Sequence, residues 1–139
     1  MIGDAVAYAA KLGVDEIIDQ ATLTGACVTA LGRDIAGVFG NDQGLVDRII
    51  AASARCGEQL WQLPLHKEYG KELKSEIADL KNTSGREGAA INGALFIESF
   101  VNDVPWVHMD LSSAAISENT HLCTKGGTGV GTGTLVEYL

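Results

Sequence analysis

The sequence predicts an α/β fold, organised as a three-layer α/β/α sandwich around a mostly parallel or mixed sheet. Short apolar runs of β type alternate along the chain with segments whose apolar residues recur at helical spacing. The stretch Asp19–Cys27 indicates this fold most directly, because a strand leads there through Thr-Leu-Thr-Gly into a helix. Such junctions lie beyond the carboxyl ends of strands, where open α/β sheets bind ligands. An ordinary strand-to-helix junction would use the same residue types.

The second observation is the strict alternation of Trp106–Leu111, which is typical of a strand. The two faces of this strand are Val107, Met109 and Leu111 on one side, and Trp106, His108 and Asp110 on the other.

The first half of the chain contains three predicted helices and two predicted strands. They are, in chain order, a helix at Met1–Leu12, a strand at Val14–Ala21, a helix at Gly25–Leu31, a strand at Ile35–Phe39 and a helix that ends at Cys56. Gly13 stops the first helix, and Thr24 is the expected N-cap of the second. Gly25 lets a ligand approach the backbone, and Asn41 or Asp42 caps the third helix.

The second half is less regular. Its segments are an edge segment or loop at Leu60–Leu65, a polar helix at His66–Lys74, a short strand at Ser75–Leu80, a loop at Asn82–Gly88, an apolar helix at Ala89–Val101, the strand Trp106–Leu111, a loop at Ser112–Cys123 and a helix at Thr134–Leu139. Pro64 restricts the first of these to an edge segment or a loop, because proline cannot donate to the ladder of a central strand. The helix at Ala89–Val101 is apolar on several sides, which predicts cover by more than one neighbour.

Composition restricts the class of protein and its partners. The 139 residues are enough for one domain, and 46% of them are hydrophobic. A formal charge of −8 with scattered basic residues argues against nucleic acid and against an anionic membrane surface. No apolar run approaches the roughly 20 residues of a membrane span, and no signal-peptide layout is present. Cys27, Cys56 and Cys123 lack CxxC spacing, which predicts buried reduced thiols in a cytosolic protein.

Few residue patterns indicate chemistry by themselves. His108 and Asp110 lie two apart on one strand and could ligate a metal or form a pair, but no third ligand stands at the usual spacing, so a structural hydrogen bond for His108 is favoured. His121 and Cys123 lie in a loop without a second pair of ligands. The glycine-rich tail lacks nucleotide-binding motifs, and no G-x-S-x-G elbow occurs.

Five collinear blocks resemble the leucyl aminopeptidase family of metallo-aminopeptidases. They are Ala21–Ala26 with Ala30–Gly32, Trp61–Leu65, Gly88–Ile91, Trp106–Asp110, and Lys125–Gly129 ahead of Thr134–Leu139. Each block is weak alone, but all five come in the family's order and at about its spacing. The resemblance covers essentially all of residues 1–139 and only the last third or so of a family member. It therefore implies the C-terminal part of the family's catalytic domain.

The resemblance implies an enzyme that removes a leucine-like N-terminal residue from peptides with two divalent metal ions, Mn or Zn. It also implies a cytoplasmic homo-oligomer, a hexamer in the family. The family's metal ligands lie in and upstream of an Asn-Thr-Asp-Ala-Glu-Gly-Arg motif that precedes the region matching Met1–Ala5. No metal-binding or catalytic residue is therefore expected here, and the chain alone should bind no metal tightly and be inactive. The loop Asn82–Gly88 is similar to that motif only superficially, so Glu87 receives no ligand role.

The substrate side of the family site does have counterparts here. The resemblance implies that Thr22 and Gly25 line the pocket for the N-terminal side chain, and that the backbone at Leu23 and Gly25 bonds the substrate's main chain. Ser112 and Ala115 would complete the pocket wall. The family's Asp-Ile-Ala-Gly is Asp110-Leu111-Ser112-Ser113 here, which would make the pocket slightly more polar, and Gly129-Val130-Gly131 replaces Gly-Arg-Pro.

An alternative is a non-catalytic folding or assembly module, either a truncated gene product or an isolated fragment. The chain begins inside an apolar helical pattern without a cap, which favours truncation. Sheet edges left bare by such a cut would favour self-association. The coding sequence before Met1 separates the two hypotheses, because the aminopeptidase hypothesis requires the acidic motif there.

Overall fold

A four-stranded mixed sheet forms the middle of the molecule. The computed structural model describes residues 1–118 and 124–139. The strands are β1 (Ile17–Ala21), β2 (Ala36–Gly40), β3 (Leu60–Gln62) and β4 (Trp106–Asp110), in the spatial order β1-β4-β2-β3. The pairs β1–β4 and β2–β3 are parallel, and β2 runs antiparallel to β4. The predicted mixed, mostly parallel sheet is confirmed.

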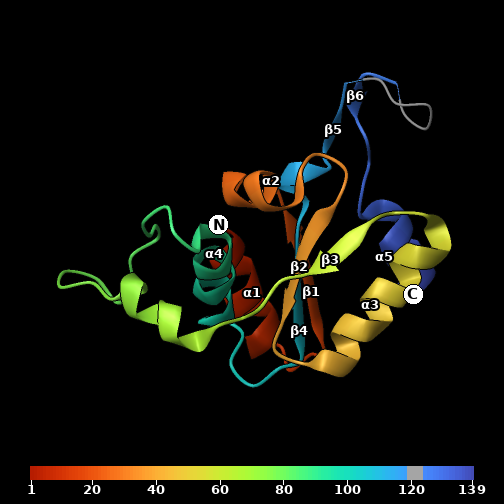
Figure 1. Cartoon of the computed structure of the whole chain (residues 1–139). Coiled ribbons are helices and arrows are strands. Elements are labelled where there is room, and N and C mark those ends of the chain that lie inside the picture. Colours follow the sequence, from red (N-terminus) through yellow and green to blue (C-terminus); the bar gives the residue numbers. More distant parts are fainter. Residues whose placement is uncertain (119–123) are drawn as a thin grey trace.

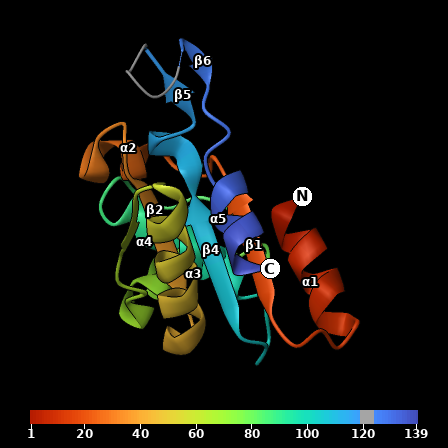
Figure 2. The ribbon, with the colours of Figure 1, turned by 90° about the vertical axis from the view of Figure 1, so that its right-hand side faces the viewer.

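Helices cover both faces of the sheet and complete three layers (Figure 1). They are α1 (Ile2–Lys11), α2 (Gly25–Leu31), α3 (Gln43–Cys56), α4 (Ala89–Glu98) and α5 (Thr132–Tyr138). The helices α3 and α5 lie side by side on one face (Figure 2), and α1 and α4 lie on the other. The three-layer α/β/α sandwich expected from the sequence is therefore confirmed.

Strand β4 separates the two apolar cores, and all five of its residues are buried. Val107 and Met109 pack with α3 and α5, whereas Trp106 packs with Phe39, α1 and α4. This division follows from the period of two along a strand, so the predicted alternation of Trp106–Leu111 is confirmed.

Side-chain caps fix the starts of two helices. The Thr24 hydroxyl accepts from the amide of Cys27 at 3.3 Å, as expected for the N-cap of α2. Asp42 caps α3, with its carboxylate 2.7 Å from the amide of Leu45. Asn41 instead bridges to the start of β4, where its side-chain oxygen accepts from the amide of Trp106 at 2.7 Å.

Two segments differ from the sequence prediction. Ser75–Leu80 forms no strand: the Ser75 hydroxyl accepts from the amides of Ile77 and Ala78 and bends the backbone. The amide of Lys81 then donates to the carbonyl of Leu73 at 2.8 Å and closes the loop. The predicted loop after β4 contains a 3₁₀ turn, η2 (Leu111–Ser113), and the strand β5 (Ile116–Ser117), which pairs with β6 (Gly126–Gly127).

The carboxyl ends of β1 and β4 point to the same edge of the sheet, because the two strands are parallel. The elements α2, η2 and the β5–β6 hairpin gather at this edge, at the top of Figure 1. The shared direction of these two neighbouring strands thus brings the two loops that follow them together. Within the described residues, no helix has both the length and the apolar character that a membrane span requires.

The start of α5 depends on one acidic side chain. Glu58 accepts from the amides of Gly133 at 3.2 Å and Thr134 at 2.9 Å, and from the Thr134 hydroxyl. We expect Glu58→Ala to lower the free energy of unfolding by about 1–2 kcal/mol, because these donors lose their partner at a helix start. Urea unfolding measures this loss. The exposed Glu76→Ala is the control, and an equal loss in both variants would contradict the role of Glu58.

Candidate functional site

A single buried carboxylate joins the two loops at this edge. Asp110 ends β4 and is fully buried. It accepts from the amides of Leu23 and Thr24, both at 3.1 Å, and from the Thr24 hydroxyl at 2.7 Å. It also accepts from the amide of Ser112 at 3.1 Å and from the Ser112 hydroxyl at 2.7 Å. The five donors come from both loops, so the carboxylate fixes one loop relative to the other.

Helix α4 packs against the loop that follows β1, on the face of the sheet that α1 also covers. A Cβ atom added at Gly93 would lie 2.9 Å from Cγ2 of Thr24 and 3.1 Å from Cδ2 of Leu23. Both distances are shorter than or at the limit of ordinary contacts, so glycine permits the close approach of α4 to the loop. The loop is thus bounded by hydrogen bonds on one side and by packing on the other.

The glycine-rich tail supports the second loop. The Thr128 amide donates to the carbonyl of Ala115 at 3.0 Å, and the Thr128 hydroxyl donates to the carbonyl of Ala114 at 2.7 Å. The amide of Ala115 in turn donates to the carbonyl of Leu111 at 2.9 Å. The tail therefore holds the segment that carries Ser112 and Ala115, a role that its composition did not indicate.

The residues expected from the family resemblance lie in these two loops. Thr22 and Gly25 are exposed, and Leu23, Ser112 and Ala115 are half-buried. Apart from its chain neighbours and the backbone of its own helix, no atom of the described residues lies within 4 Å of the position that a Cβ at Gly25 would take. The backbone there is therefore open to a ligand. Asp110 links Leu23, Thr24 and Ser112 directly. The sequence pattern indicates Asp110 only as a possible metal ligand or partner of His108. Its position between two loops becomes visible only from the β1–β4 pairing.

His108 makes the structural hydrogen bond that its sequence context favoured. Its Nδ1 lies 2.6 Å from Oδ1 of Asp19, and the Trp106 ring N–H donates to Oδ2 of Asp19 at 2.6 Å. The pairing register explains this partner, because Asp19 on β1 stands opposite His108 on β4. The His108 ring is also stacked near Phe39 and Trp106. His108 and Asp110 therefore do not form a pair with each other.

The thiols have different environments. Cys27 is buried, and this burial raises the pKa of its thiol to about 12, with the negative charge of Asp110 adding to the effect. Cys56 is exposed, so the expectation of a buried thiol is wrong there, because the residue ends α3 next to Gly57. His121 and Cys123 lie outside the described residues.

The described side chains do not form the donor set of a two-metal centre. Within residues 1–118 and 124–139, no group of three or more His, Cys, Asp or Glu side chains is placed to hold a metal ion. The donors of Asp110 already occupy both of its oxygens, and Asp19 is engaged by Trp106 and His108. What these residues can do is bind and orient a ligand, and no metal-dependent step is assigned to them.

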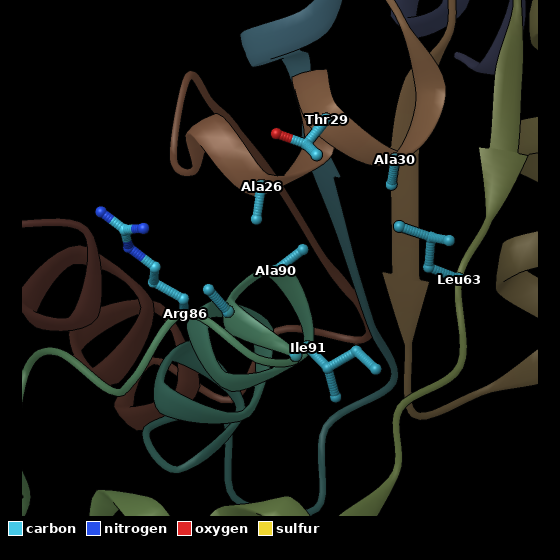
Figure 3. Close-up of a pocket in the computed structure, with 9 residues that line it drawn as sticks. Ala26, Thr29, Ala30, Leu63, Arg86, Ala90 and Ile91 are labelled. Atoms are coloured by element: carbon cyan, nitrogen blue, oxygen red, sulfur yellow. The ribbon is translucent and has the colours of Figure 1, made fainter.

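A pocket of about 680 Å³ lies next to the first loop, between α2 and the start of α4 (Figure 3). Ala26, Ala30 and Thr29 line it from α2, and Ala90 and Ile91 line it from α4. None of the five expected substrate residues lines this pocket. The pocket and the Asp110-linked loops are therefore neighbouring but separate features.

The importance of Asp110 is testable with the isosteric variant Asp110→Asn. We expect the free energy of unfolding to fall by about 2–4 kcal/mol, because an amide NH₂ would face buried N–H and O–H donors. Urea unfolding measures the loss, and Asp103→Asn, in an exposed turn, is the control for the same chemical change. A variant as stable as the control would mean that the carboxylate does not hold the loops.

Comparisons with known proteins identify the family of this chain. The cytosol aminopeptidase family, catalytic domain, matches residues 1–136. A "probable cytosol aminopeptidase" of a Picosynechococcus species is 49% identical over 139 residues, and one of Gloeobacter violaceus is 47% identical over 139 residues. Both alignments cover 99% of this chain and 28% of the relative. The chain thus spans about 28% of the length of the curated relatives that it matches.

A solved structure shows the same fold. A mutant of tomato leucine aminopeptidase superposes with a TM-score of 0.93 at 41% sequence identity, over 99% of this chain and 27% of the tomato chain. The similarity of fold therefore extends through all three layers. Because the family match covers nearly every residue, the chain belongs to the cytosol aminopeptidase family, as a part of its catalytic domain.

Proposed function

We propose that this chain is the substrate-binding part of a metal-dependent aminopeptidase that removes leucine-like N-terminal residues from peptides. In this proposal Thr22, Gly25, Ser112 and Ala115 surround the first side chain of the peptide, and Leu23 and Gly25 contact its main chain. The observation that carries the proposal is the set of five hydrogen bonds on Asp110, which holds both loops in one arrangement. Family membership supports the class of reaction.

The hydrogen bonds also restrict how Leu23 would contact a peptide. Its amide N–H already donates to Asp110, so its carbonyl is the backbone group left for a substrate. A carbonyl accepts from an N–H, so we propose that Leu23 orients the peptide through one of the peptide's own amide donors. Such positioning holds the scissile bond in place while other groups react.

The proposed site would have a broad preference among aliphatic side chains. A pocket wall discriminates one methylene by only about 1–3 kcal/mol. Ser112 donates its hydroxyl proton to Asp110, so that proton is not available to the substrate. We therefore propose that Ala115 and Thr22 have more influence on side-chain preference than Ser112.

We propose that the metal ligands belong to polypeptide outside this chain. The described residues offer no suitable donor group, and the chain spans about 28% of its relatives. The Mn or Zn ions that the family resemblance implies would then meet the two loops only in a longer protein. We further propose a cytoplasmic location, in line with the names of the relatives.

A homo-oligomer is proposed as the assembled form. Strands β1 and β3 are the outer strands of the described four-stranded sheet, and outer strands carry unpaired backbone groups that favour association. Family membership supports the same proposal, and the hexamer implied by the resemblance is its specific form. Light scattering of the concentrated chain measures its oligomeric state, and a monomer there would contradict the proposed homo-oligomer.

The proposed function is tested by narrowing the pocket wall in a longer protein that joins this chain to the upstream acidic motif. We expect Ala115→Phe to lower kcat/KM for leucine amide about tenfold and to affect alanine amide much less, because the ring would occupy the space of the larger side chain. The neighbouring Ile116 is 62% exposed, which makes Ile116→Phe the matched control.

Two results would contradict the proposal. The first is an equal effect of Ala115→Phe on leucine and alanine amides. The second is hydrolysis of leucine amide by residues 1–139 alone with added Mn²⁺ or Zn²⁺, because this would show that the chain carries its own metal centre. A calorimetric isotherm with two tight metal sites on the isolated chain would support that contradiction directly.

A further inference from the structure

The pocket between α2 and α4 has the properties of a ligand site. Its volume of about 680 Å³ falls within the range of small-molecule pockets, roughly 300–1,000 Å³. Figure 3 shows Ala26 and Ala30 of α2 on one side, Ala90 and Ile91 of α4 on the other, and Leu63 at one end. These side chains make the walls aliphatic and leave room between the two helices.

Within the described part of the chain, one charged side chain lines this pocket. Arg86 lies at the end opposite Leu63 (Figure 3) and is exposed. Among the residues that the structure describes, Arg86 takes part in no ion pair. The Thr29 hydroxyl is already used, since it donates to the carbonyl of Gly25 at 3.3 Å. An incoming anion would therefore find a guanidinium without a carboxylate partner, a group that binds carboxylates with two parallel hydrogen bonds.

The pocket adjoins the proposed substrate loop. Ala26, which lines the pocket, directly follows Gly25, and α4 contacts the same loop through Gly93. A ligand in the pocket would thus lie next to the loop that is proposed to hold the peptide through Leu23 and Gly25. The net charge of −8 repels anions at long range, but salt screens this repulsion beyond about 8 Å, so the local guanidinium decides binding.

We propose that this pocket binds a free α-carboxylate that carries aliphatic side chains, with the carboxylate on Arg86 and the aliphatic groups between α2 and α4. The proposal rests on the proposed function, because a peptidase meets two ligands of this chemistry. One is the far end of a short peptide, and the other is the released amino acid. The pocket volume of about 680 Å³, within the range of drug-sized ligands, favours the peptide end over a single amino acid.

The test measures binding to residues 1–139 by calorimetry or by NMR titration. The probes are N-acetyl-leucyl-leucine, its C-terminal amide, and free leucine. Acetylation removes the free α-amine that an aminopeptidase substrate needs, so binding of this probe does not depend on the proposed function. We expect the acetylated dipeptide to bind, and its amide to bind roughly three- to tenfold more weakly because the amide has no charge for Arg86.

The variants separate the two parts of the pocket. Arg86→Gln should abolish the difference between acid and amide, whereas Arg33→Gln, an exposed arginine that does not line the pocket, should preserve it. Ala30→Phe should fill the pocket and weaken both probes at least tenfold, and because Ala30 is exposed on α2 the fold should tolerate the ring.

Free leucine identifies the source of the carboxylate. Leucine that binds as tightly as the acetylated dipeptide supports the proposal with the released amino acid as ligand, and weaker binding supports it with the peptide end. Equal binding of acid and amide, no binding of any probe, or binding that Arg86→Gln and Ala30→Phe leave unchanged would overturn the proposal. None of these results bears on hydrolysis of leucine amide by the longer protein, so the two proposals fail independently.

Discussion

The arrangement of the site depends on one buried carboxylate. Asp110 lies at the end of β4, opposite Ala21 at the end of β1, and its two oxygens accept all five of their hydrogen bonds from the loops that follow these strands. A buried carboxylate is costly unless donors surround it. Because those donors are the backbone and hydroxyl groups of Leu23, Thr24 and Ser112, the requirement of one side chain determines the shape of both loops.

The central position of β4 makes this possible. The strand is buried on both faces, and each face meets a different layer of helices. The polar residues that it contains therefore need internal partners. His108 and Trp106 find such a partner in Asp19 on the neighbouring strand. Asp110 lies at the end of β4, opposite the end of β1, and finds its partners in the loop residues Leu23, Thr24 and Ser112. A one-residue change in the β1–β4 register would separate both sets of partners.

Local sequence signals predicted much of this fold. The cap at Thr24, the helix Gly25–Leu31 and the alternation in β4 follow from interactions within a few residues, and these elements form as predicted. The strand predicted at Ser75–Leu80 was wrong, because the Ser75 hydroxyl accepts from the amides of Ile77 and Ala78 and bends the backbone there. The role of Asp110 and the pocket between α2 and α4 depend on residues far apart in the sequence, such as Leu23 with Asp110 and Ala26 with Ala90. No single-sequence pattern specifies such pairs. The family resemblance, in contrast, predicted the family and the fold class, and the comparisons confirm both. The substrate role of the two loops stays a prediction.

The most direct test of the central claim is amide hydrogen exchange at Leu23 and Thr24, followed by NMR. Both amides lie in a loop after β1, and loops usually exchange quickly. Because Asp110 accepts from both N–H groups, we expect them to exchange as slowly as the amides inside β4. Exchange as fast as that of Gly85, which lies in an exposed loop, would show that the carboxylate does not hold the two loops together.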